Sequence, residues 1–371
     1  MFENLKFAYL MHVDWDWIKQ RPHFLYEELT KIYEVELYFI HKVIDSKAHY
    51  VRNTKASNGA RKIKKIPFSG RFPILRLIER LLNRRLIKSV TLYDVVWITS
   101  PLLLDFIPAE IIKRKIVVYD CMDDFLGFYS GLTGSKKFER LWALENDLLK
   151  IADIVFFSSE YLRDKQLSTY KDISGRLFVV NNGISSELIN KTYPAKLNGV
   201  KSINSKRLNL MYFGTIDRWL DFELILNTLQ EFPDISFTLI GPINVRVPSH
   251  SRIKYVGPIP HEKLYDFSEE ADAFIMPFNI SQLIRSVDPV KIYEYLFFDK
   301  PVFVIDYEEI YKFLPFVHMY SNQLDFFKLI KDLQEGRLKS LNFKDKIEFL
   351  NKNTWSERCK QIVTIIEEVR V

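Results

Sequence analysis

The sequence is poor in cysteine and has no long apolar run. Its two cysteines, Cys121 and Cys359, lie far apart without metal-ligand spacing, which excludes a disulfide framework and favours a reducing compartment. No stretch reaches the roughly eighteen apolar residues that a membrane-spanning helix needs. The first residues, Met1 to Lys6, include an acid and show no signal-peptide pattern. We therefore expect a cytoplasmic protein whose membrane contact, if any, is peripheral and on the inner face of the plasma membrane.

Several catalytic motifs are absent as well. No GxGxxG follows a predicted strand, which disfavours dinucleotide binding, and no GxxxxGK[ST] is present, which excludes a P-loop NTPase. The GxSxG and HExxH motifs of hydrolases and zinc proteases are missing. The seven histidines are scattered without ligand spacing, so we expect no metal site and no cofactor.

Short apolar runs alternate with longer helical patterns along the chain. We expect strands at 6–11, 34–40, 94–99, 115–119, 153–158 and 176–180, and then at 208–213, 236–240, 254–256, 273–276 and 301–305. Helices are expected over 21–32, from residue 73 onward and over 355–369. This alternation predicts an α/β protein with two doubly wound parallel sheets.

A polar segment divides the two halves. We expect an N-terminal Rossmann-like domain over residues 1–190, a linker over 191–207, a second Rossmann-like domain over 208–350 and a terminal segment over 351–371. The length of 371 residues suits two domains. Two such domains facing a cleft would hold ligands beyond the carboxyl ends of their strands.

The most informative stretch runs from Arg285 to Val304. Asp288 is placed to cap a helix whose first turn begins near Pro289. A helix start together with Lys291 suits a diphosphate, and Glu294 is placed to accept both hydroxyls of a ribose. The spacing of these residues alone is also compatible with an ordinary surface helix of mixed charge.

This stretch resembles the nucleotide-binding signature of family-4-like GT-B glycosyltransferases, P-x-K-x-x-E-Y-x-x-x-x-K-P-V. Further similar segments follow in the family's order along nearly the whole chain. They are Val180-Asn181-Asn182-Gly183-Ile184, Phe213-Gly214-Thr215-Ile216, Leu239-Ile240-Gly241-Pro242, Tyr255-Val256-Gly257-Pro258, Ala271 to Phe278 and Trp355-Ser356-Glu357-Arg358.

The resemblance implies a nucleotide-sugar donor, most often UDP-linked, and a last helix that packs back on the first domain. It implies nucleotide-binding roles for Gly214 and Gly257, and Arg218 resembles the basic residue that neutralises the departing diphosphate. Ser286 stands where the family has the first of two paired glutamates, so the usual contact to the donor sugar is either absent here or supplied by another residue. The C-terminal signature most resembles retaining enzymes that need no metal.

Two segments of the first half narrow the resemblance. Residues 17–23 and 119–125 look like a subgroup that includes a teichuronic acid biosynthesis glycosyltransferase. In place of the family's glycine pair stand Gln20, Arg21 and His23, which we expect on the acceptor or phosphate side. We expect Asp123 and Asp124 to be the catalytic residues. The alternative is that these two acids cap a helix or lie in a solvated loop.

Asp14-Trp15-Asp16 has the DxD form that holds a metal in some glycosyltransferases. It follows the first strand, where that motif has no usual place in this fold, so we interpret the carboxylates as loop or capping groups.

Residues 61–90 are strongly basic. They hold ten lysines and arginines against one acid, Glu79, and from Pro73 onward the pattern is helical. A basic stripe at Arg76, Arg80, Arg84 and Lys88 lies beside an apolar face, so residues 71–88 suit an anionic membrane surface. The alternative is a helix packed on the sheet with a solvated basic side; no motif supports nucleic-acid binding.

Taken together, these patterns predict a glycosyltransferase of the hexosyltransferase type. It would move a sugar from a nucleotide-diphosphate sugar to a saccharide or lipid-linked acceptor in capsule, exopolysaccharide or cell-wall polymer synthesis. The alternatives are a catalytically silent GT-B scaffold in a polymer-assembly complex and a nucleotide-sugar epimerase.

Overall fold

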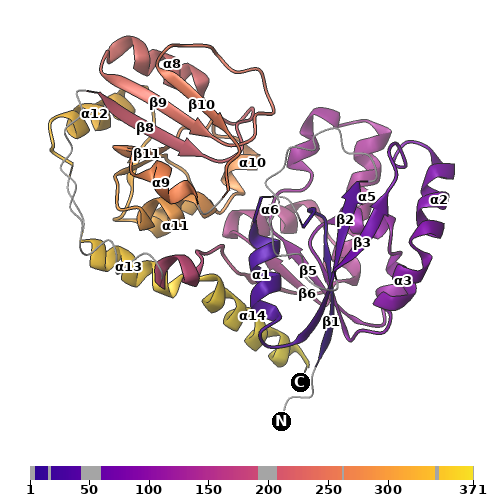
Figure 1. The fold of residues 1–371 in the computed structure, drawn as a ribbon. Coiled ribbons are helices and arrows are strands. Elements are labelled where there is room, and N and C mark those ends of the chain that lie inside the picture. Colours follow the sequence, from indigo (N-terminus) through magenta and orange to yellow (C-terminus); the bar gives the residue numbers. More distant parts are fainter. Residues whose placement is uncertain are drawn as a thin grey trace. The chain divides into compact units, whose positions relative to one another are not determined.

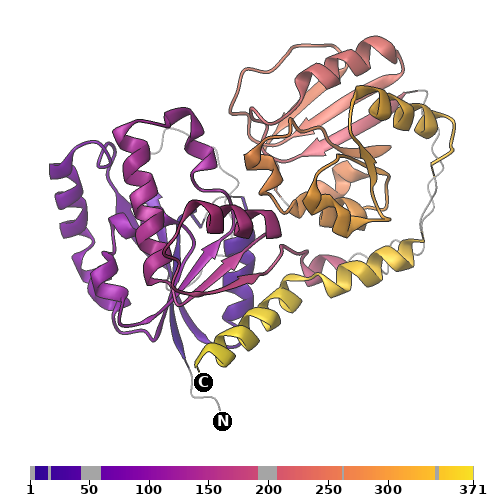
Figure 2. The same ribbon diagram turned by 180° about the vertical axis from the view of Figure 1, so that it is seen from behind.

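The computed structural model describes residues 5–15, 18–42, 60–190, 207–260, 263–338 and 342–370 (Figures 1 and 2). Contacts divide the chain into two compact units. The first comprises Met1–Asn181 with Arg358–Val371, and the second comprises Asn182–Glu357. Almost all of the expected linker, residues 191–206, lies outside the described residues.

The first unit is built on a seven-stranded parallel sheet in the order β3-β2-β1-β4-β5-β6-β7. Its strands are β1 (Lys6–Met11), β2 (Glu34–Lys42), β3 (Arg61–Lys65), β4 (Val95–Ile98), β5 (Ile116–Cys121), β6 (Ile154–Phe157) and β7 (Arg176–Val179). Its helices are α1 (Arg21–Leu29), α2 (Pro73–Leu82), α3 (Arg84–Val90), η1 (Pro101–Asp105), α4 (Ala109–Ile112), η2 (Gly127–Leu132), α5 (Lys136–Ile151) and α6 (Glu160–Thr169).

The second unit carries a six-stranded parallel sheet in the order β10-β9-β8-β11-β12-β13. Its strands are β8 (Leu208–Phe213), β9 (Ile235–Ile240), β10 (Ile253–Gly257), β11 (Ala273–Met276), β12 (Val302–Ile305) and β13 (His318–Tyr320). Its helices are α8 (Phe222–Glu231), α9 (Leu264–Ser268), α10 (Gln282–Arg285), α11 (Val290–Phe297), η4 (Glu308–Phe313), α12 (Gln323–Gln334) and α13 (Phe343–Lys352).

β4, β6 and β11 are apolar at every residue, as expected for strands of a parallel sheet that helices cover on both faces. β4, β6 and β11 are buried at every residue. The predicted class of two doubly wound parallel sheets is therefore confirmed.

The last helix, α14 (Trp355–Arg370), begins in the second unit and continues as part of the first. The hydroxyl of Tyr33 donates to Glu367 Oε1 at 3.5 Å, and Arg176 donates to the carbonyl of Glu368 at 3.5 Å. Gln361 donates to the carbonyl of Val179 at 3.4 Å. The end of α14 is thus held by α1's following turn and by β7.

Three local expectations need correction. The helix expected over 21–32 ends at Leu29, and β3 and β13 were not expected as strands. The continuous helix expected from residue 73 onward is broken at Asn83, which ends α2 and begins α3. The cause is tertiary, because the Asn83 side chain bonds both backbone groups of Lys64 in β3.

Candidate functional site

Glycines shape the carboxyl ends of β8, β9 and β10. Gly214 follows β8, and its amide donates to the carbonyl of Ile240 at 2.9 Å. Gly241 follows β9 with a positive φ of 142°, and a Cβ there would lie 1.9 Å from the carbonyl oxygen of Gly214. Its amide donates to the carbonyl of Gly257, the last residue of β10, at 2.9 Å. The turns after β8 and β9 and the end of β10 therefore contact one another through backbone atoms.

Helix α11 is attached to the same edge. The amide of Phe213 donates to the hydroxyl of Tyr295 at 3.1 Å. The ammonium of Lys291 lies 5.4 Å from the centre of the Phe213 ring and 3.5 Å from Oε2 of Glu294. Glu294 is buried, whereas Lys291 is partly exposed. The structure thus brings Lys291 and Glu294 together beside the residue that precedes Gly214.

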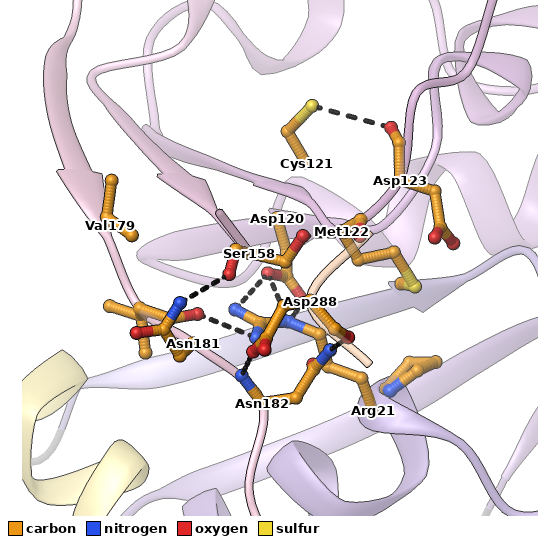
Figure 3. Close-up of polar contacts among 12 residues, drawn as sticks. Arg21, Asp120, Cys121, Met122, Asp123, Ser158, Val179, Asn181, Asn182 and Asp288 are labelled. Carbon is orange, nitrogen blue, oxygen red and sulfur yellow. Dashed lines mark hydrogen bonds and ion pairs between the residues drawn. The ribbon is translucent and has the colours of Figure 1, made fainter. Parts of the chain in front are cut away.

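The start of α11 differs from the sequence interpretation. Pro289 directly precedes α11, which begins at Val290, and among the described residues no side chain caps the helix. Asp288, expected as the cap, instead accepts a hydrogen bond from the amide of Asn182 and pairs with Lys312 at 2.9 Å. Asn182 returns a bond to the carbonyl of Asp288 at 2.7 Å (Figure 3). Asp288 therefore anchors the loop before α11 and leaves the first helical N–H groups uncapped.

Two other predicted positions lie near these elements in sequence. The hydroxyl of buried Ser286 donates to the carbonyl of Gln282 in α10 at 2.8 Å, so this position carries a satisfied hydroxyl and no charge. The side chain of Arg218 is exposed in the loop after β8, where its amide donates to Oδ1 of Asp217 at 2.6 Å.

In the first unit, Arg21 is buried against Asp120. Its Nε lies 2.9 Å and 3.2 Å from the two carboxylate oxygens of Asp120, and Nη2 lies 2.9 Å from Oδ1. Nη1 donates to the carbonyl of Val180 at 2.8 Å (Figure 3). Only 3% of Arg21 is exposed, so its charge is neutralised within the unit. Arg21 ties the start of α1 to the ends of β5 and β7.

His23 and Gln20 form the start of α1. Nδ1 of His23 accepts a hydrogen bond from the amide of Gln20 at 3.2 Å, and its ring lies 5.3 Å from that of Trp15. Burial lowers the pKa of His23 to about 4, so the ring is neutral at pH 7. Of the three residues expected on the acceptor side, only Gln20 is exposed.

The adjacent acids Asp123 and Asp124 have different environments. Asp123 follows β5 and is partly exposed; burial raises its pKa to about 7, and neighbouring Asp120 and Asp124 add to this against the opposing effect of Arg21. Asp124 is buried, accepts from the amide of Gly127 at 3.1 Å and pairs with Lys165. Asp123 is therefore the better placed of the two for proton transfer.

Sequence reasoning missed His12, which directly follows β1. Its Nδ1 lies 2.8 Å from the hydroxyl of Thr99, which follows β4. Burial lowers the pKa of His12 to about 4, although the side chain is partly exposed. Since β1, β4 and β5 are neighbours, a neutral imidazole shares an edge with Asp123. The position of a histidine directly after the first predicted strand could have identified His12 from the sequence.

The DxD segment is only partly described. Asp14 pairs with His41 at 2.8 Å, in agreement with the interpretation as a loop carboxylate. Asp16 and Trp17 lie outside the described residues.

Comparison with known proteins shows that part of the sequence is similar to a curated protein. The candidate teichuronic acid biosynthesis glycosyltransferase TuaH of Bacillus subtilis (strain 168) is 29% identical over 206 residues, which is 50% of this chain. The match spans about half of that relative, 49% of its length. No protein-family model matches the chain.

Solved structures match over almost the whole chain. Sucrose-phosphate synthase from Thermosynechococcus elongatus has a TM-score of 0.69 at 14% identity and covers 99% of both chains. HepE of Anabaena, in complex with UDP-glucose, has a TM-score of 0.66 at 12% identity and covers 98% of this chain and 100% of its own. The structure of trehalose-6-phosphate from E. coli bound with UDP-2-fluoro glucose has a TM-score of 0.64 at 12% identity and covers 97% of this chain and 98% of its own. The chain therefore has the GT-B fold, and about half of it resembles a teichuronic acid biosynthesis glycosyltransferase in sequence.

Proposed function

We propose that the protein is a glycosyltransferase that moves a sugar from a nucleotide-diphosphate sugar to a saccharide or lipid-linked acceptor. The observation that carries this proposal is the edge of the second sheet, where Lys291, buried Glu294 and the start of α11 adjoin a turn at Gly214. The UDP-glucose in HepE and the UDP-2-fluoro glucose in the E. coli structure support a UDP-linked donor. The name of TuaH supports a role in capsule, exopolysaccharide or cell-wall polymer synthesis.

In this proposal the second unit binds the donor. Glu294 accepts hydrogen bonds from the ribose hydroxyls, and bare backbone at Gly214 and Gly257 allows the nucleotide to approach closely. The diphosphate is stabilised by the uncapped N–H groups after Pro289, by Lys291 and by Arg218. These are fixed charges and dipoles, so the proposed mechanism uses no metal and no cofactor.

The reaction forms a bond between an acceptor oxygen and the anomeric carbon as the bond to the diphosphate breaks. We propose retention of configuration, in which the departing diphosphate takes the proton of the acceptor hydroxyl. Asp123 then orients or stabilises the sugar. In an inverting enzyme Asp123 would instead take that proton, for which a pKa of about 7 is well suited.

We assign the acceptor to the first unit. Gln20 is the exposed residue of the expected set, whereas the buried contacts of Arg21 and His23 suit positioning roles for both. Neutral His12 joins Asp123 as a group placed to bond a sugar hydroxyl.

The proposed location is the inner face of the plasma membrane, where a lipid-linked acceptor would be met. Within the described residues, none of the helices combines the length and the apolarity that crossing a bilayer demands.

The test is a thermal-shift screen of UDP, GDP, ADP, CMP and dTDP, because a ligand that binds only the native state raises apparent stability. Slow hydrolysis of the matching nucleotide sugar, unchanged by EDTA, would support a metal-independent enzyme. Nucleotide binding without hydrolysis or transfer to any lipid-linked acceptor would instead support the scaffold. Loss of hydrolysis in EDTA, restored by Mg²⁺, would contradict the fixed-charge mechanism.

A further inference from the structure

Helix α2 turns its apolar side outward. Ile74, Leu77 and Leu81 are 69%, 58% and 60% exposed. On a helical wheel at about 100° per residue, these side chains share one arc with Ile78 and Leu82, which are also exposed. A surface helix of a water-soluble protein ordinarily directs such an arc to the core.

The buried side of α2 is polar. Glu79 accepts hydrogen bonds from the amide of Ile66 at 2.7 Å and the hydroxyl of Ser69 at 2.9 Å. The side-chain oxygen of Asn83 accepts from the amide of Lys64 at 3.0 Å, and its nitrogen donates to the Lys64 carbonyl at 2.9 Å. β3 is the edge strand of the sheet, so these side chains pair the backbone groups that the edge would leave open. Because the polar side of α2 packs against the backbone of β3 and the following turn, the apolar side of the helix faces solvent.

The turn before α2 extends the apolar surface. Phe68 is 73% exposed and has a φ of 63°, a left-handed conformation that is uncommon for an aromatic residue. Phe72, the residue that precedes the helix, is exposed as well. In Figures 1 and 2, α2 lies at the margin of the first unit's own sheet. We call Phe68, Phe72, Ile74, Leu77, Ile78, Leu81 and Leu82 the α2 apolar face.

The surroundings of this face are cationic. Residues 61–90 contain ten basic residues, and their single acid, Glu79, is buried. Arg71, Arg80, Arg84, Arg85 and Lys88 are exposed along the same segment. A second copy of this surface would bring like charges together, and a nucleic acid would leave the apolar side chains in water. An anionic bilayer interface offers apolar contact and negative charge at once.

We propose that the α2 apolar face inserts into the headgroup region of an anionic lipid bilayer, with the flanking lysines and arginines on lipid phosphates. This inference goes beyond glycosyl transfer, because lipid binding needs neither donor nor acceptor. The two proposals therefore fail separately.

The experiment measures binding of the full chain to vesicles by flotation. One vesicle type is phosphatidylcholine alone, and the other contains equal parts of phosphatidylcholine and phosphatidylglycerol. The expected result is binding to the mixed vesicles that weakens as salt is raised, with little binding to phosphatidylcholine.

Two variants separate insertion from charge. Leu77→Gln with Leu81→Gln keeps good helix formers and should weaken binding by roughly tenfold or more, because two apolar side chains no longer enter the bilayer. The matched control changes exposed helical leucines elsewhere, Leu167→Gln with Leu324→Gln, and should bind as the wild type does. Arg84→Gln with Lys88→Gln should weaken binding roughly 30-fold, and Lys328→Gln with Lys331→Gln in α12 is its control.

The proposal is overturned if the wild type does not bind the mixed vesicles. It is also overturned if the Leu77/Leu81 variant binds as well as its control, since the protein would then adsorb by charge alone. Self-association that the Leu77/Leu81 variant abolishes, without vesicle binding by the wild type, would show that a second copy covers the face.

Discussion

At the scale of single residues, Glu294 and Asp123 carry separate parts of the proposed reaction. Glu294 is buried in the middle of α11, one turn after Lys291, and Asp123 is partly exposed after β5. The first is placed to hold a ligand. The second has a pKa of about 7, which is suited to proton exchange near neutral pH.

We predict that Glu294→Gln weakens nucleotide binding by roughly 1–3 kcal/mol, because a charged acceptor for the ribose hydroxyls is lost. Calorimetry with the nucleotide found in the thermal-shift screen measures this. Glu231→Gln, an exposed acid at the end of α8, is the matched control and should bind as the wild type does. Equal affinity of both variants would remove Glu294 from the site.

A second prediction concerns Asp123→Asn. If Asp123 only orients the sugar, transfer should fall by no more than about tenfold, whereas loss of a general base lowers the rate by ~10²–10⁴-fold. The product's anomeric configuration by NMR decides between the cases. An inverted linkage with a loss in that upper range would overturn retention and make Asp123 the base. Asp124→Asn is a separate comparison, since Asp124 pairs with Lys165 and a loss there should appear as reduced stability.

At the scale of elements, the loop after β8 and the loop after β9 contact each other through backbone atoms at two glycines. Gly214 and Gly241 lie so close that a Cβ on Gly241 would be 1.9 Å from the Gly214 carbonyl oxygen. The position of the backbone after β8 therefore depends on that after β9.

We predict that Gly241→Ala lowers the unfolding free energy of the second unit by roughly 2 kcal/mol or more and weakens nucleotide binding, because the turn after β8 must shift. Gly336→Ala is the control: its φ of 67° is also positive, but a Cβ there meets nothing within 4 Å. Denaturant melts compare the two variants. A Gly336→Ala loss as large as that of Gly241→Ala would assign the effect to backbone conformation and not to crowding.

The element scale also shows what the sequence could reveal. Apolar runs and glycine turns predicted β8, β11 and the edge that α11 joins. β3 was missed because Arg61–Lys65 carries one buried apolar residue, Ile63, among four cations. The break at Asn83 and the pairing of Asp288 with Lys312 depend on partners distant in sequence. The local sequence pattern carries no information about such partners. Asn83 therefore looks like one more residue of a continuous helix, and Asp288, which precedes a proline, looks like a helix cap.

At the scale of the whole molecule, the stability of the first unit should depend on pH. Glu145 in α5 is buried, and it accepts hydrogen bonds from the hydroxyls of Tyr119 at 3.1 Å and Tyr170 at 2.7 Å. Burial raises the pKa of Glu145 from 4.5 to about 7. Between these values the native state keeps a proton that the unfolded chain has lost, so the unfolding free energy falls as pH rises.

We predict that Glu145→Gln flattens this decline, because an amide stays neutral throughout. Between pH 4.5 and about 7, the unfolding free energy of the wild type should fall by roughly 3 kcal/mol more than that of the variant. Denaturant titrations at the two ends of the window measure it, with exposed Glu139→Gln on the same helix as the control. Asp123, whose pKa is also raised to about 7, leaves a residual slope in the variant. An unchanged slope would show that Glu145 is ionised in the native state at neutral pH.

The discontinuity of the first unit has a consequence for biosynthesis. Residues 358–371 belong to that unit but are translated after the whole of the second. While the ribosome makes residues 182–357, the surfaces at Tyr33, Val179 and Arg176 that meet α14 have no helix to contact. Domains generally fold in the order of their synthesis. Here the synthesis of the first unit begins before that of the second unit but ends after it. A nascent chain stalled before residue 358 would expose the surface that α14 later covers to chaperones and proteases.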